Sequence, residues 1–152
     1  MNAEYTSKHG IIARQPFELY MSFVDMRNFT RMLPEDKQKD VQADFDTIKV
    51  TVQGFSIGVR VTERRPYSKI QFADDGAPFR FNISLHFDPC ADSSSTDFHI
   101  RVSAELNLMM KMMLGGKIQQ GIDKIVDGLA AVAEGRTPEG FNPEEFSKNF
   151  KF

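Results

Sequence analysis

The middle of the chain alternates between apolar and polar residues with a period of two. In residues 79–87, every second position holds phenylalanine, isoleucine or leucine, and arginine, asparagine, serine and histidine lie between them. Residues 98–106 repeat this alternation. Because successive side chains of a β-strand point to opposite faces, each segment predicts a strand with one face against a core and one face in water.

Shorter alternations in residues 47–52, 56–61 and 70–72 predict three more strands. Turn-forming residues separate these segments, and they are Gly54, Arg65-Pro66, Asp74-Asp75-Gly76 and the polar loop 92–96. Consecutive strands joined by short links indicate an antiparallel meander that covers a core with one of its faces.

Helical segments flank the meander on both sides. Residues 4–12 predict a first strand, and Pro16 favours the start of a short helix. Asp25 is suited to cap a second short helix, which ends before Pro34. Near the other end, apolar residues recur at intervals of three and four, which predicts an amphipathic helix of about seven turns. These residues are Leu114, Ile118, Ile122, Ile125, Leu129 and Val132.

The composition excludes several classes of protein. The 152 residues include 19 Lys and Arg and 21 Asp and Glu, for a formal net charge of −2. A dedicated nucleic-acid binder is usually strongly basic, so no nucleic-acid partner is expected. The single cysteine, Cys90, excludes an intrachain disulfide and fits a reducing compartment. With no apolar leader and no apolar run long enough to cross a bilayer, we expect a cytoplasmic protein without a membrane span.

Three stretches resemble a known family. Residues 9–20 and 23–29, together with Val61–Pro66 followed by Ile70 and Phe72, are similar to the START-like superfamily, also called SRPBCC, helix-grip or polyketide cyclase-like. The resemblance implies an α+β fold, in which a curved antiparallel sheet of roughly six to seven strands surrounds a long C-terminal helix. Two short helices follow the first strand in that fold.

The chain divides into a domain and a tail, because its character changes at Gly135. Residues 1–136 form the START-like domain in this interpretation. Residues 137–152 carry four phenylalanines, which are too apolar to remain in water, and we expect them to dock on this domain or on a neighbouring chain. The chain is then a monomer or a homodimer.

Members of this superfamily enclose an apolar cavity between the sheet and the long helix. The resemblance therefore implies non-covalent binding of a hydrophobic small molecule, such as a lipid, a quinone or a polyketide-like compound. Two alternatives remain open, namely a cyclase, dehydratase or hydrolase-type enzyme and a ligand-free protein-interaction module. The residues expected to line the cavity are Phe29, Met32, Val59, Phe72, Phe81, Ile83, Leu85, Ile100, Val102, Met110, Met113, Leu114, Ile118 and Ile122.

Catalysis has little support in the sequence. The positions of the predicted strands that face the core are apolar, whereas general acid–base chemistry needs a titratable group within reach of the substrate. Tyr20, Thr30, Asp74 and Asp75 are the polar residues that such a cavity can recruit, and we expect the Tyr20 hydroxyl at the surface. No catalytic residue and no cofactor is predicted, and an enzyme is the less favoured interpretation.

Three histidines form a possible cluster on the wet face of the sheet. If the loop between Phe87 and Phe98 closes symmetrically, His86 faces His99 on the neighbouring strand, and His9 joins them if the first strand lies beside the last. Two imidazoles on adjacent strands can chelate a metal ion. A solvated histidine pair is the simpler interpretation, because no cysteine or acidic residue has matching spacing, and no metal site is predicted.

Two further patterns concern the surface and the long helix. Met109–Met113, followed by Gly115 and Gly116, predict either a flexible gate at the cavity mouth or methionines that fill a core gap. Basic residues on the wet face indicate either an ordinary solvated surface or a footprint for an anionic partner, and we favour the first. These basic residues are Lys49, Arg60, Lys69, Arg80 and Arg101.

Overall fold

The computed structural model describes residues 2–28, 39–52, 55–77, 79–91 and 94–133. Within these residues, the strands are β1 (Asn2–Thr6), β2 (Gly10–Ile12), β3 (Val41–Ala43), β4 (Thr47–Val52), β5 (Phe55–Arg65), β6 (Lys69–Asp74), β7 (Phe81–Pro89) and β8 (Thr96–Glu105). The helices are α1 (Pro16–Phe23) and α4 (Leu108–Ala133). None of the helices described is both long enough and apolar enough to cross a bilayer.

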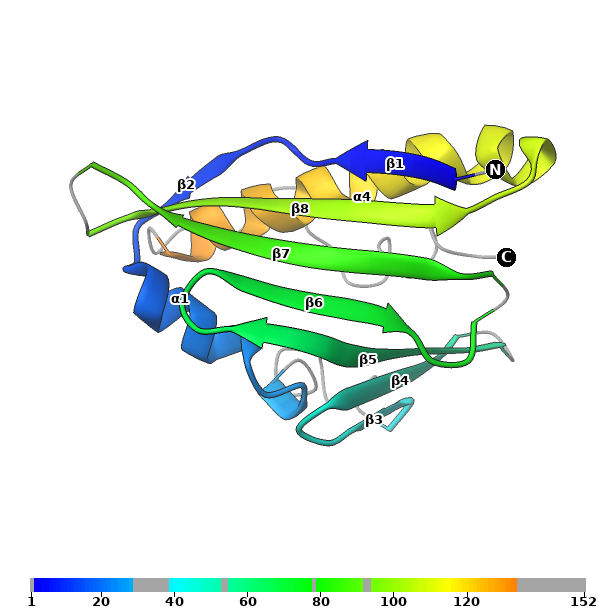
Figure 1. The fold of residues 1–152 in the computed structure, drawn as a ribbon, viewed down its shortest axis with the longest axis horizontal. Coiled ribbons are helices and arrows are strands. Elements are labelled where there is room, and N and C mark those ends of the chain that lie inside the picture. Colours follow the sequence, from blue (N-terminus) through cyan, green and yellow to red (C-terminus); the bar gives the residue numbers. More distant parts are fainter. Residues whose placement is uncertain (1, 29–38, 53–54, 78, 92–93, 134–152) are drawn as a thin grey trace.

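All strands belong to one antiparallel sheet, with the order β1-β8-β7-β6-β5-β4-β3 and with β2 also paired to β8 (Figure 1). The meander from β4 to β8 confirms the prediction made from the period-two alternation. Its register is also as predicted, because His86 pairs with His99 and Phe87 pairs with Phe98 across β7 and β8.

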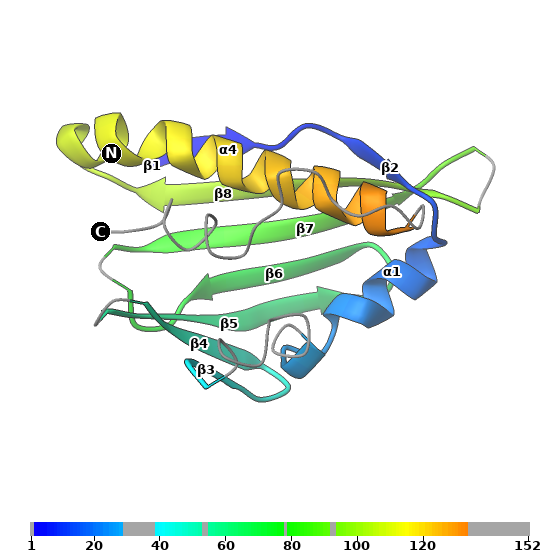
Figure 2. The same ribbon diagram turned by 180° about the vertical axis from the view of Figure 1, so that it is seen from behind.

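The two helices cover one face of the sheet, which we call the inner face. Seen from behind, α4 lies along β1 and β8, and α1 closes the end of the sheet where β7 ends (Figure 2). The opposite, outer face carries no helix in the described part of the chain. The arrangement is therefore the α+β architecture expected from the sequence, with the long C-terminal helix packed on an antiparallel sheet.

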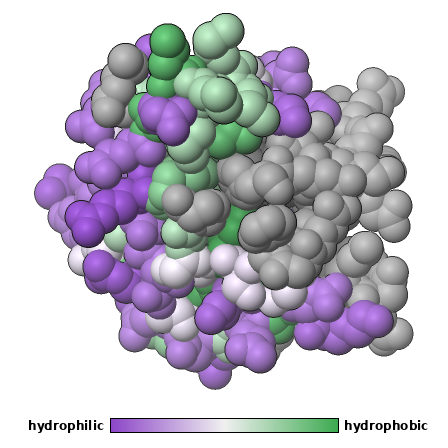
Figure 3. All heavy atoms as spheres, turned by 90° about the vertical axis from the view of Figure 1, so that its right-hand side faces the viewer, coloured by the Kyte–Doolittle hydropathy of each residue, from purple (hydrophilic) through white to green (hydrophobic). Residues whose placement is uncertain are grey.

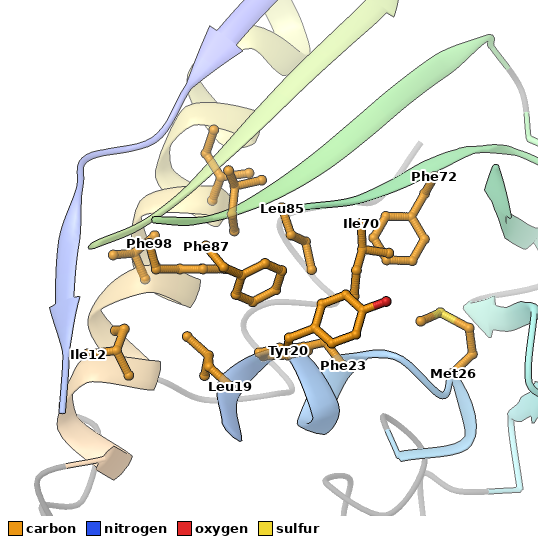
Figure 4. Packing of buried hydrophobic residues seen from close by; sticks show 13 residues of the cluster. Ile12, Leu19, Tyr20, Phe23, Met26, Ile70, Phe72, Leu85, Phe87 and Phe98 are labelled. Carbon is orange, nitrogen blue, oxygen red and sulfur yellow. The ribbon is translucent and has the colours of Figure 1, made fainter. Parts of the chain in front are cut away.

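The core is densest at the end of the inner face that α1 covers. Phe87 and Phe98 are fully buried, and their ring centroids lie 5.4 Å apart. Leu19, Tyr20 and Phe23 of α1 point into this cluster (Figure 4). Tyr20 is more deeply buried than predicted, with 5% of its surface exposed, because its ring packs edge-on against Phe87.

Two predicted strands have different bounds in the structure, and one strand was not predicted. The segment 4–12 forms two strands, because Ser7 interrupts the ladder: the Ile100 N–H donates to the Ser7 hydroxyl, and the Ser7 N–H donates to the Ile100 carbonyl, each at 2.8 Å. The strand β3 was not predicted, because its three residues are too few to show an alternation of apolar and polar side chains. β5 continues to Arg65, past a register shift between Val61 and Glu63.

The long helix also begins earlier than its apolar periodicity predicts. Asn107 caps it, since the Met110 N–H donates to the Asn107 side chain at 2.8 Å. The methionine run therefore lies in the first turns of α4 rather than ahead of the helix. The Gly115-Gly116 pair lies beyond the first turn rather than in it. The segment predicted to act as a gate is thus part of the helix, and gating itself stays a prediction.

The second short helix was predicted over residues that lie mostly outside the described ranges. At its predicted start, the Arg27 N–H donates to the Asp25 carboxylate at 3.0 Å, and capping by Asp25 stays a prediction. Phe29, Thr30, Met32 and Pro34 lie outside the described residues, as does the tail at 137–152.

Candidate functional site

The inner face has a closed end and an open end. Under α1, the inward side chains of Ile70, Leu85 and Ile100 are buried. Toward the start of α4, the inward side chains of Phe81 and Ile83 are only partly buried. Along β7 the inward side chains thus pass from buried to partly buried, whereas on β8 Val102 is partly buried and Ala104 beyond it is buried again.

Two core clusters meet at this transition. One contains Phe87, Phe98 and Ile122, and the other contains Leu106, Leu114 and Ile118. Tyr5 and Val102 are partly buried and pack against both clusters. The candidate binding surface is therefore the inner face around Val102, between α4 and the middle strands.

Most of the predicted lining residues gather here. Val59, Phe81, Ile83, Val102 and Met110 are partly buried, whereas Phe72, Leu85, Ile100, Leu114, Ile118 and Ile122 are buried in the two clusters. Met113 is 64% exposed. Phe29 and Met32 lie outside the described residues. A ligand site formed by these residues remains a prediction.

Tyr5 belongs to the candidate binding surface, and the sequence did not reveal it. Its hydroxyl is buried and has no hydrogen-bond partner among the described residues. It lies against the backbone of α4 at Gly115, where a Cβ atom would come within 2.8 Å of the hydroxyl oxygen. An isolated tyrosine in a short N-terminal segment carries no signal that would have identified this contact.

This contact predicts opposite behaviour for two neighbouring glycines. A Cβ atom at Gly116 would meet nothing within 4 Å, so Gly116→Ala should stabilise the fold by about 1 kcal/mol through helix propensity. Gly115→Ala should lose about 1–2 kcal/mol relative to Gly116→Ala, because the methyl group crowds Tyr5. Urea denaturation of both variants measures the difference. Equal stabilities would show that α4 does not pack closely on Tyr5.

Arg64 is a second residue that the sequence analysis missed. The register shift in β5 aligns Arg64 with the buried Ile70, so its side chain joins the inner face. The guanidinium donates to the Val24 carbonyl at 3.1 Å, the Phe45 carbonyl at 2.7 Å and the Asp46 carboxylate at 2.6 Å. The expectation that no charged residue faces inward is therefore wrong, and Arg64 holds the β3–β4 turn to the end of α1.

Of the two aspartates expected in a loop, Asp74 is the last residue of β6 and Asp75 follows the strand. Asp74 accepts a hydrogen bond from the Phe81 N–H at 3.0 Å, and Asp75 is exposed. A hollow of about 300 Å³ lies beside Asp74, with a largely polar lining that does not suit a hydrophobic ligand. The residues lining it are Asn2, Asp74, Arg80, Phe81, Asn82, Ser103 and Glu105.

The predicted histidine cluster is present on the outer face. The rings of His86 and His99 stack with centroids 4.5 Å apart, and His9 stacks on the other side of His99 at 4.3 Å. His9 Nδ1 donates to the Asp97 carboxylate at 2.9 Å. In stacked rings the nitrogen lone pairs run side by side rather than converging on one point. Within the described residues, no group of three His, Cys, Asp or Glu side chains can hold a metal ion.

Burial and neighbouring charges lower the pKa of two of these histidines. Burial, the charge of His99, and then Lys69 and Arg101 lower the pKa of His86 to about 4, while Asp88 acts in the opposite direction. The pKa of His99 is also lowered, mainly by burial and then by His9. Both imidazoles are therefore neutral at pH 7.

The low pKa of His86 predicts a pH-dependent stability. The unfolded chain binds a proton on His86 near pH 6.5, whereas the folded chain binds it only near pH 4. Stability should therefore fall as the pH drops from 6.5 to about 4, by about 1 kcal/mol once solvent screening is considered. Urea denaturation across this range should show a shallower dependence for His86→Gln than for the wild type. An identical pH dependence of stability in the two proteins would contradict the lowered pKa of His86.

The basic residues of the outer face are mixed with acidic ones. Lys69 pairs with Glu63 at 3.3 Å, and Arg65 pairs with the same carboxylate at 3.1 Å. Asp88, Asp97 and Glu105 alternate with the inward residues on β7 and β8 and so share this face. The interspersed signs fit a solvated surface rather than a footprint for an anionic partner.

The comparisons with known proteins rest on structure. No family model and no curated protein sequence matches the chain. Among solved structures, norcoclaurine synthase from Thalictrum flavum aligns with a TM-score of 0.66 at 9% identity, over 88% of this chain and 87% of that chain. A protein from Thermus thermophilus aligns with a TM-score of 0.61 at 14% identity, over 88% and 98% of the two chains.

A third structure is the Aha1 dimer from Colwellia psychrerythraea. It aligns with a TM-score of 0.55 at 14% identity, over 86% of this chain and 96% of that chain. The fold is the START-like helix-grip fold. At these identities the likeness establishes the helix-grip fold alone, since one fold supports many unrelated functions.

Proposed function

We propose that this helix-grip domain binds a hydrophobic small molecule non-covalently, between the inner face of the sheet and α4. The observation that supports this proposal is the partly exposed apolar surface around Ile83 and Val102, next to a filled core. Burial of a ligand there would gain about 25 cal/mol for each Å² of apolar surface removed from water, before ordering costs. A lipid, a quinone or a polyketide-like compound has the apolar surface this binding needs.

An enzymatic role has less support. Arg64 is inward and charged, but it is engaged by two carbonyls and a carboxylate and is not a free acid or base. Asp74 is engaged by the backbone of β7. The ligand-free interaction module predicts instead that the surface around Val102 binds no small molecule, and the experiment below separates the two proposals.

A matched pair of substitutions on β8 tests ligand binding. Val102 points inward and is partly buried, and its neighbour Ser103 points to the outer face. Val102→Asn should weaken binding of a fluorescent anilinonaphthalene probe about tenfold, because a polar group replaces apolar contact. Ser103→Asn should leave the affinity unchanged. Equal probe affinities in both variants, at similar thermal stability, would exclude this surface as the binding site.

The tail, the oligomeric state and the compartment belong to the same proposal. We propose a cytoplasmic protein, because a lone cysteine fits a reducing compartment. Residues 137–152 would dock on the domain itself or on a neighbouring chain. Light scattering after deletion of residues 141–152 separates these two, since only a tail shared between chains would change the mass of the oligomer.

A further inference from the structure

The first turns of α4 carry an apolar surface that faces away from the core. Leu108 and Met113 are each 64% exposed, Met109 is 70% exposed and Met112 is 78% exposed. We call these four residues the α4 tip. Figure 3 faces the end of the molecule where α4 begins and shows apolar side chains gathered there.

The α4 tip is a second apolar stripe on one helix. Met110, Leu114 and Ile118 form the stripe that packs against the sheet. A helix on the surface of a globular protein needs only one such stripe. Residues 108 and 112, like 109 and 113, are four apart and form a separate stripe, which the core does not explain.

The charged side chains of the helix next to the tip are all positive. From residue 106 to residue 122, the chain carries Lys111 and Lys117 and no acidic residue. Both lysines are exposed. The amino end of a helix adds a partial positive charge. This end of α4 is thus apolar and locally cationic in a chain whose net charge is −2.

These features favour a lipid surface over a second copy of the chain. The first turns of α4 extend past the end of β8 (Figure 1), so the tip is a protrusion rather than a groove. A two-fold contact between two tips would bring together two ends of the same positive sign, which is unfavourable. An interfacial helix that inserts apolar side chains, with lysines reaching the headgroups, has the same combination of features.

We propose that the α4 tip docks on a bilayer that contains anionic phospholipid. Its four side chains enter the boundary between headgroups and acyl chains, and Lys111 and Lys117 pair with the headgroup phosphates. Docking of this kind goes beyond binding of a small molecule. It places the open end of the inner face, at Phe81 and Met110, beside the membrane.

Flotation of the intact chain with vesicles tests this proposal. We expect binding to equimolar phosphatidylcholine–phosphatidylglycerol vesicles and weaker binding to phosphatidylcholine alone. The double variant Met109→Gln, Met113→Gln should bind more than tenfold more weakly, since glutamine keeps the helix propensity and removes the apolar contact. Lys111→Gln should weaken binding about fivefold and reduce its dependence on salt. Met21→Gln is the matched control, because Met21 is 48% exposed on α1 and should not matter.

Three results would overturn the proposal. The first is a wild-type chain that does not float with either kind of vesicle. The second is a double variant, folded by circular dichroism, that floats as well as the wild type. The third is a change from dimer to monomer in the double variant, which would assign the tip to a second copy. Probe affinity measured without vesicles reports on the inner face separately, so failure of one proposal leaves the other distinguishable.

Discussion

Replacing Phe98 with alanine should lower the free energy of unfolding by about 3–5 kcal/mol. Phe98 is fully buried, and its ring stacks on Phe23 of α1 at 6.2 Å as well as lying beside Phe87. Removing the ring leaves a cavity where β7, β8 and α1 meet, and the surrounding backbone of paired strands has little freedom to collapse into it. Chemical denaturation monitored by circular dichroism measures the loss.

Phe17→Ala is the matched control for this substitution. Phe17 also lies on α1 and contacts another aromatic ring, that of Tyr67, but it is 51% exposed. Its truncation should cost less than about 1 kcal/mol, because the site is already partly solvated. Similar losses for Phe17→Ala and Phe98→Ala would place the main core elsewhere.

Replacing Arg64 with methionine should cost about 2–3 kcal/mol of stability. Methionine keeps much of the apolar stem but cannot donate to the carbonyls of Val24 and Phe45 or to Asp46. The side chain of Arg64 is only 21% exposed, so the substitution removes charge-assisted hydrogen bonds that are partly shielded from water. The guanidinium also lies 4.1 Å from the centre of the Phe45 ring, and that contact is lost as well.

Arg65→Met separates this effect from a general loss of charge. Arg65 follows directly in β5, but its side chain is 65% exposed and its ion pair with Glu63 is solvated. That substitution should cost less than about 1 kcal/mol. If denaturation midpoints fall equally in the two variants, Arg64 does not hold the β3–β4 turn to α1.

The fold could be predicted from the sequence wherever one hydrophobic period extends over many residues. The alternation in 79–87 and 98–106 was sufficient to predict β7, β8 and their register, because a one-residue slip would expose every apolar side chain. The features that were missed are single-residue irregularities. Ser7 divides the first strand, and the register shift after Val61 turns Arg64 inward. Neither irregularity changes the local hydrophobic pattern enough to be recognised in the sequence.

The candidate site was only partly predictable for the same reason. The alternation predicted correctly which side chains of β7 and β8 point inward, but not how deeply each is buried. That depth depends on where α1 and α4 lie over the sheet. The contact of Tyr5 with Gly115 joins residues far apart in the chain, and the exposure of Met113 follows from the start of α4 at Leu108.

Native mass spectrometry of the intact chain, compared with its denatured mass, tests ligand binding most directly. We expect an adduct of small-molecule mass that disappears on denaturation, is reduced in Val102→Asn and is retained in Ser103→Asn. The mass of such an adduct would also identify the class of ligand. A wild-type chain that carries no adduct, either as purified or after incubation with a total lipid extract, would contradict binding of a hydrophobic molecule at the inner face.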